Sequence, residues 1–161
     1  MSGTIGRVAE YDDDRWMTLA LQLSRMCPRS ETAYSVGAVV VGSDGEEISR
    51  GFSRETDDKV HAEESALLKV GMDDVRLGTA TIYSTLEPCS RRASRPRPCA
   101  QLILHAGIPR VVTAWREPSL FVTDVQGIEL LAAAGATVVE LDEYAEQALV
   151  PNAHLPIGRS A

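Results

Sequence analysis

Residues 80–89 read Ala-Thr-Ile-Tyr-Ser-Thr-Leu-Glu-Pro-Cys, a short apolar run followed by a proline and a cysteine. The apolar run predicts a strand over 80–84. Pro88 stiffens the backbone that presents Cys89, and Pro98 does the same for Cys99. The motif His61-Ala62-Glu63 lies upstream of the strand. Potential metal ligands therefore stand where loops meet regular elements.

Strands and helices alternate on both sides of this stretch. The segments 36–41 and 47–52 predict a hairpin around the turn 42–45, with 36–41 buried on both faces. Apolar spacing predicts a first helix over 15–26, which Pro28 ends. Further helices are expected at 63–70, 100–105, 127–134 and 144–150, and further strands at 111–115 and 136–141. This order predicts an α/β fold, with helices on both faces of an open sheet.

Length and charge limit the function further. The 161 residues predict one domain, and we expect a flexible N-terminus over 1–14, the domain over 15–150 and a C-terminal tail over 151–161. The net charge of −7 repels a polyanion, which argues against a nucleic-acid polymer as partner. No apolar run reaches the ~18 residues of a membrane span. Asp12-Asp13-Asp14 stands where a leader peptide would be basic and then apolar, so we expect a cytoplasmic protein with no membrane partner.

His61, Cys89 and Cys99 are the candidate metal ligands. One imidazole and two thiolates can hold Zn²⁺ and leave its fourth position open. Three cysteines are too few for a disulfide framework. We expect Cys27 to be a buried bystander near the end of the first helix. The alternative is a closed structural zinc site, for which Cys27 is the only spare thiol.

Glu63 is the candidate catalytic residue. On a regular helix, residues i and i+2 lie about 200° apart, so His61 and Glu63 can share a site only if His61 stands at the helix entry. Zinc lowers the pKa of a bound water towards about 7, and Glu63 would move that water's protons during attack on the carbon that bears an amine. We expect Glu64 to be an ordinary solvated residue of the first helical turn.

These motifs resemble the cytidine-deaminase-like superfamily of zinc deaminases over roughly residues 15–141. Within it, the chain is most similar to the pyrimidine deaminase domain of riboflavin biosynthesis. The motifs that carry the resemblance are Val36-Gly37-Ala38, His61-Ala62-Glu63, Thr85 to Ser90, Ser94 to Cys99, and Ala106 to Val112. The nine residues between the cysteines distinguish this group, because the zinc deaminase pattern has only about two there.

The resemblance implies a three-layer α/β/α sandwich with a five-stranded mixed sheet, and a homodimer or homotetramer. From the length of the chain we expect a stand-alone deaminase, without the reductase domain of the family. The resemblance also implies a set of substrate-binding positions: Ala33, Ser35, Ala62, Arg95, Glu117 and Ser119. The chain departs from the family at three places. Ala33 replaces an Asn that helps to bind substrate, Arg91-Arg92 replaces His-His, and Glu117-Pro118-Ser119-Leu120 replaces Asp-Pro-Asn-Pro.

The predicted substrate is a small aminated heterocycle. A phosphoribosylated aminopyrimidine of the riboflavin route is the first hypothesis. A free base, nucleoside or nucleotide of the guanine, cytosine, cytidine or dCMP type is the alternative, and a zinc-binding regulatory domain without catalysis is the alternative of another class. The basic loop around Arg95 is either a phosphate clamp or a solvated charge cluster. Trp115 is expected in the core rather than as a stacking surface for the heterocycle.

Overall fold

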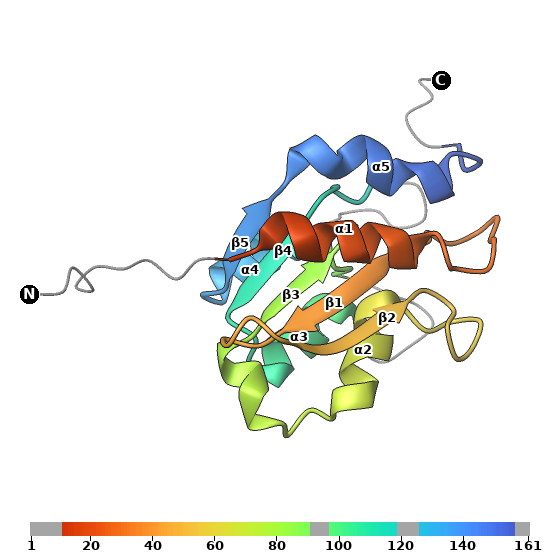
Figure 1. Cartoon of the computed structure of the whole chain (residues 1–161). Helices are drawn as coiled ribbons and strands as arrows, with labels where there is room; N and C mark the ends of the chain where they lie inside the picture. The colour runs from red at the N-terminus through yellow and green to blue at the C-terminus, as the bar shows by residue number, and fades with distance from the viewer. Residues whose placement is uncertain (1–10, 91–96, 119–125, 157–161) are drawn as a thin grey trace, which may run out of the picture.

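The computed structural model describes residues 11–90, 97–118 and 126–156, and its centre is a five-stranded sheet in the order β2-β1-β3-β4-β5 (Figure 1). The strands are β1 Gly37–Val41, β2 Glu47–Phe52, β3 Thr81–Ser84, β4 Arg110–Thr113 and β5 Thr137–Glu140. β1 runs antiparallel to both β2 and β3, whereas β3, β4 and β5 run parallel. The prediction of a mixed sheet with an opening hairpin is confirmed.

Helices cover both faces of the sheet. The helices α1 Asp13–Ser24 and α5 Ala145–Leu149 lie on one face, and α2 Ala62–Val70, α3 Cys99–Ala106 and α4 Gly127–Ala133 lie on the other (Figure 1). Successive side chains of a strand point to opposite faces. Val39 therefore packs in the α1 layer, while its neighbour Val40 packs in the α2 layer. The predicted three-layer sandwich is confirmed.

The strand β1 is buried along its whole length, as its unbroken apolar sequence predicts. Its first residue, Gly37, lies directly under α1. A Cβ placed on Gly37 would meet the carbonyl oxygen of Ala20 at 1.9 Å and the backbone nitrogen of Ser24 at 2.8 Å. The glycine of the Val36-Gly37-Ala38 motif is therefore needed for the close packing of a helix on a strand.

The helix α1 begins at Asp13, inside the segment expected to be flexible. The Asp13 carboxylate pairs with the guanidinium of Arg110, whose nearer nitrogen lies 2.8 Å away, and accepts a hydrogen bond from the Tyr83 hydroxyl at 2.5 Å. An acidic residue in the first turn also interacts favourably with the helix dipole. Asp13 thus attaches the start of α1 to β3 and β4.

Among the residues that the structure describes, three short 3₁₀ helices were not expected: Val75–Thr79, Asp142–Tyr144 and Val150–Asn152. The last of them leads into the segment expected to be a tail. There, Asn152 is 1% exposed and Leu155 is 2% exposed. Both side chains are thus part of the buried interior, and the folded domain extends past residue 150.

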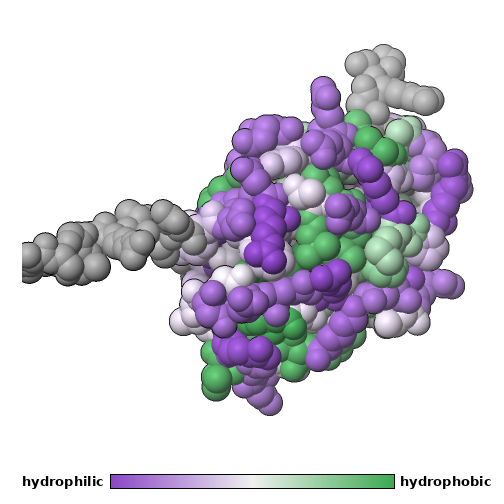
Figure 2. All heavy atoms as spheres, in the orientation of Figure 1, coloured by the Kyte–Doolittle hydropathy of each residue, from purple (hydrophilic) through white to green (hydrophobic). Residues whose placement is uncertain are grey.

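The outer surface is mostly hydrophilic on the face shown in Figure 2, with hydrophobic side chains gathered in smaller areas between hydrophilic ones. In the part of the chain that the structure describes, no helix combines the length and the apolar character needed to cross a bilayer.

Candidate active site

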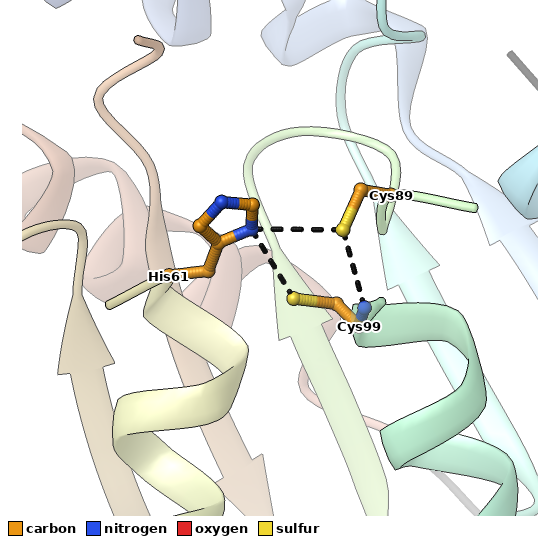
Figure 3. A group of neighbouring side chains, drawn as sticks. All are labelled: His61, Cys89 and Cys99. Carbon is orange, nitrogen blue, oxygen red and sulfur yellow. Dashed lines mark hydrogen bonds between the residues drawn. The ribbon is translucent and has the colours of Figure 1, made fainter. Parts of the chain in front are cut away.

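Three separate elements bring His61, Cys89 and Cys99 together (Figure 3). His61 is the N-cap residue of α2, Cys89 lies in the loop that follows β3, and Cys99 is the first residue of α3. His61 has extended backbone angles, φ −87° and ψ 161°. It therefore stands at the helix entry, outside regular helical geometry, as the H-x-E spacing requires.

The distances between these side chains fit a zinc ion. Nδ1 of His61 lies 3.6 Å from Sγ of Cys89 and 3.4 Å from Sγ of Cys99. A tetrahedral zinc with its usual bond lengths holds a nitrogen and a sulfur ligand about 3.6 Å apart. Within the described residues, this is the one group of three or more His, Cys, Asp or Glu side chains arranged to share a metal ion. The donor set of one imidazole and two thiolates is also one that zinc prefers.

The site favours the thiolate form of Cys89. The pKa of the Cys89 thiol falls to about 4, chiefly because the Cys99 side chain donates a hydrogen bond to its sulfur. The hydrogen bond and charge of His61 and the hydrogen bond from the Cys99 backbone lower the pKa further, whereas burial raises it. The backbone N–H of Cys99 donates to Cys89 Sγ at 3.1 Å. Cys99 stands at the N-terminus of α3, whereas Cys89 lies in the loop after β3. Cys89 nevertheless receives a hydrogen bond from the first N–H of α3.

Glu63 and Glu64 are neighbours in the sequence but lie in different environments. Glu63 is the second residue of α2 and is 4% exposed. The Glu64 carboxylate accepts a hydrogen bond from the backbone N–H of His61 at 3.2 Å, which caps the helix that carries the histidine. Glu64 therefore has a structural role in the first turn, whereas the Glu63 side chain, two residues after His61, is buried.

Glu117 brings another carboxyl group to this region. Burial is the main cause that raises its pKa to about 8, and the charges of Cys89, Glu87 and Glu63 raise it further. These groups influence one another because they lie close together at the same end of the sheet. The predicted substrate position Glu117 is thus brought to the candidate site. Arg95 and Ser119 lie outside the described residues.

The other predicted substrate positions differ in what their side chains contact. The side chain of Ala62 is fully buried among core residues that include Val36 and Leu86. The Ser35 hydroxyl accepts a hydrogen bond from Arg54 at 2.7 Å, and Ala33 is half-buried. Ala62 could therefore meet a ligand only through its backbone, and the Ser35 side chain is already held by the protein.

Trp115 contributes to the core, as expected. It packs against two of the core clusters and meets Tyr34 edge-on, with ring centroids 5.7 Å apart. The Tyr34 hydroxyl donates to the carbonyl oxygen of Pro118 at 3.1 Å. These contacts connect the segment before β1 to the segment after β4, next to the candidate site.

Cys27 lies elsewhere. Its Sγ contacts the carbonyl oxygen of Val36 at 3.4 Å, and burial raises the pKa of its thiol. It does not belong to the group that could share a metal ion. Its half-buried position near the end of α1 agrees with a bystander rather than with a fourth ligand.

Sequence reasoning missed three polar residues that shape the site: Arg54, Glu87 and Asn152. Arg54 has a positive φ of 61° and donates to the carbonyl oxygens of Pro28 and Tyr34. Asn152 accepts from the backbone N–H of Ser35 at 2.7 Å. Nothing in the local pattern marks these residues, apart from the position of Glu87 inside the Thr85–Cys89 motif.

The fold and the three-ligand centre are those of a zinc-binding deaminase, and comparison with known families agrees. The cytidine and deoxycytidylate deaminase zinc-binding region matches residues 10–115. The chain therefore belongs to this family.

Within this family, the chain is similar to pyrimidine deaminases of riboflavin biosynthesis. The chain is 38% identical over 132 residues to the diaminohydroxyphosphoribosylamino-pyrimidine deaminase of Schizosaccharomyces pombe, covering 81% of this chain and 32% of that protein. A structure of RibD from Acinetobacter baumannii superposes with a TM-score of 0.74 at 31% identity, covering 88% of this chain and 38% of that one. The dCMP deaminase of the cyanophage S-TIM5 shares the fold, with a TM-score of 0.61 at 22% identity over 87% of this chain and 99% of that one. The chain spans about a third of the length of the curated relatives it matches.

Proposed function

We propose that the chain is a zinc-dependent hydrolytic deaminase that acts on a small aminated heterocycle and releases ammonia. The observation that carries the proposal is the placement of the buried Glu63 two residues after His61, at the start of the helix whose entry His61 forms. A purely structural zinc site needs no such carboxylate. His61, Cys89 and Cys99 would hold the ion, and the fourth position would face the substrate.

The chemistry follows from these groups. When bound, zinc acts as a Lewis acid that lowers the pKa of a water molecule towards about 7. Glu63 would accept a proton from the attacking water and return it to the ring nitrogen of the substrate, and then help the amine to leave. One water is consumed, the C–N bond breaks, a carbonyl forms, and ammonia departs.

The substrate we propose is a phosphoribosylated aminopyrimidine, the type that gives the Schizosaccharomyces pombe relative its name. The long segment between Cys89 and Cys99 and the carboxyl group of Glu117 support this choice. A free base, nucleoside or nucleotide of the guanine, cytosine, cytidine or dCMP type is the second candidate, because Ala33 lacks the amide side chain that the resemblance to the riboflavin-route enzymes predicts at its position.

An ammonia-release assay across aminopyrimidines, purines, nucleosides and their phosphates tests the proposal. We expect the zinc-loaded protein to act best on the phosphoribosylated aminopyrimidine. Glu63→Gln should keep zinc and lose ammonia release by at least about 100-fold, within the range of general acid–base catalysis. Glu64→Gln is the matched control, because glutamine can still accept the hydrogen bond from His61. Near-normal turnover by Glu63→Gln would remove Glu63 from the mechanism.

The rival from another class is a zinc-binding regulatory domain. It predicts full zinc binding with no ammonia release from any compound in the panel. A closed structural site that recruits Cys27 predicts zinc loss in Cys27→Ala, whereas the proposed open site predicts that zinc stoichiometry is unchanged in that variant.

We also propose a homodimer or homotetramer in the cytoplasm. Leu68 of α2 is 70% exposed and lines, with Leu67, Met72 and Leu102, a mostly apolar depression between α2 and α3. The proposal rests on the resemblance to oligomeric deaminases, and this depression is the surface that we propose an assembly covers. Cys27, Cys89 and Cys99, all of which the structure describes, form no disulfide, and a reducing compartment keeps such thiols available for zinc. Light scattering of the zinc-loaded protein measures the assembly, and a monomer at all concentrations would contradict it.

A further inference from the structure

Glu87 is a buried carboxylate that the proposed chemistry does not use. It lies in the Thr85–Cys89 motif, two residues before Cys89, and is 3% exposed. Burying a charged group is costly unless it is fully hydrogen-bonded. The hydrogen-bond partners of the Glu87 carboxylate therefore indicate its role.

Both carboxylate oxygens accept hydrogen bonds from backbone N–H groups. One accepts from the N–H of Glu117 at 2.9 Å, and the other accepts from the N–H of Ile128 at 2.9 Å. The backbone N–H of Glu87 donates to the carbonyl oxygen of Trp115 at 2.7 Å. Glu87 thus holds the segment after β4 twice and the first turn of α4 once.

The contact with α4 is unusually close. Ile128 is the second residue of α4, and its N–H is one that the helix itself cannot satisfy. A Cβ on Gly127 would lie 1.8 Å from the carbonyl oxygen of Pro88 and 3.2 Å from Cγ of Glu87. The Ser90 hydroxyl accepts the N–H of Gln126 at 3.2 Å. The residues on either side of Cys89 therefore form the surface on which α4 begins.

A carboxylate is required at this position. Glutamine has nearly the same shape but only one acceptor oxygen, and its amide nitrogen is a donor. In Glu87→Gln, one of the two N–H groups must therefore face an N–H₂ group. The Glu87→Gln variant therefore distinguishes a requirement for two acceptor oxygens from a requirement for the shape of the side chain.

We propose that Glu87 is a positioning residue, which holds Glu117 and the start of α4 at a fixed place beside Cys89 and so sets the wall of the substrate pocket. This inference rests on the proposed function, for which Glu117 is one of the substrate-binding positions that the resemblance implies. Glu87 has no contact with the reacting atoms in this scheme and acts only through the backbone that it holds.

Amide hydrogen exchange of the zinc-loaded protein tests the placement without any substrate. In the unaltered protein, the amides of Glu117 and Ile128 should be protected, although one lies in a loop and the other in the first turn of a helix. Glu87→Gln should speed exchange of at least one of them by about 10-fold or more, in line with the loss of a charge-assisted bond. The amide of Leu141, which donates to the carbonyl oxygen of Thr113 at 2.8 Å, is the control and should not change. Unprotected Glu117 and Ile128 amides in the unaltered protein, or unchanged exchange in the variant, would overturn the inference.

A double-mutant cycle tests the action through Glu117. Glu87→Gln should lower kcat/KM for the phosphoribosylated aminopyrimidine by about 10- to 100-fold while zinc stoichiometry stays the same. In a Glu117→Gln background, the same change should cost less than about 3-fold, because the group that Glu87 positions is already altered. Equal losses in both backgrounds would overturn the inference. If the unaltered protein releases no ammonia, the proposed function fails, and the exchange comparison alone decides whether Glu87 holds this segment.

Discussion

Replacing Asn152 by alanine tests whether residues 150–155 are an integral part of the domain. The Asn152 side chain is 1% exposed. It accepts from the N–H of Ser35 at 2.7 Å and donates to the carbonyl oxygens of Ser35 at 3.1 Å and Ala148 at 3.2 Å. One amide group thus satisfies both backbone groups of a buried residue that precedes β1.

The expected magnitude follows from these three bonds. Each buried polar group that loses its partner costs about 1–3 kcal/mol, and a water entering the vacated space reduces the cost to the lower part of that range. Asn152→Ala should therefore lower the free energy of unfolding by about 3–5 kcal/mol. With a urea m-value of about 2 kcal/mol/M, the unfolding midpoint should fall by roughly 1.5–2.5 M.

Urea denaturation at constant free zinc measures this loss. His154→Ala is the matched control, since it removes one hydrogen bond, from Nε2 of His154 to the carbonyl oxygen of Ser30 at 2.6 Å, from the same segment. That variant should lose about 1 kcal/mol. If Asn152→Ala lost no more stability than His154→Ala, the hydrogen bonds of Asn152 to Ser35 would not stabilise the domain as the structure indicates.

Three further predictions concern the frame of the domain and its metal. The hydrogen bond from Arg110 holds the pKa of Asp13 below its usual value. The ion pair between Asp13 and Arg110 therefore contributes fully to stability above about pH 4, and this contribution is lost as the pH falls through the lowered pKa of Asp13. Acid unfolding of Asp13→Asn should lack this component, and identical acid titration curves would contradict it. Gly37→Ala should lower the free energy of unfolding by at least about 2 kcal/mol, because the new methyl group meets backbone of α1. Gly78→Ala should change it by less than about 0.5 kcal/mol, because a Cβ at Gly78 meets nothing within 4 Å, and calorimetry compares the two. Free zinc at about 100 times its Kd should raise the free energy of unfolding by about 2.7 kcal/mol. A His61→Ala variant should show no such rise, and an undiminished rise would remove His61 from the ligand set.

The sheet and the ligand cluster could be predicted because their signals are local and periodic. The unbroken apolar run of β1 identifies a strand buried on both faces. His61 and Glu63 are two residues apart and would face opposite sides of a regular helix, so the sequence predicts that His61 stands at the entry of α2, as it does. Proline before each cysteine indicates an irregular segment, and Pro98 is indeed the N-cap residue from which α3 begins. In each case a few consecutive residues carry the information.

The polar framework could not be predicted in the same way. Asn152 and Ser35 are far apart in the sequence, and their hydrogen bonds depend on a segment that has no apolar period. The role of Glu87 depends on two N–H groups that come from different parts of the chain. Asp13 falls in the polar N-terminal segment 1–14 that we expect to be flexible, whereas its ion-pair partner Arg110 lies at the start of β4. Such pairs become visible only when the fold has placed both members.

The hydrogen bonds between Cys89 and the first turn of α3 have a consequence for engineering. The N–H of Cys99 donates to Cys89 Sγ at 3.1 Å, and the N–H of Ala100 donates to the Cys89 carbonyl oxygen at 3.0 Å. The two ends of the segment between the cysteines are therefore tied together, independently of what lies between them. We therefore expect that this segment can be exchanged for segments of other lengths while Cys89 and Cys99 keep their places. Grafting segments from other deaminases between Ser90 and Pro98 would then show whether this segment affects substrate choice.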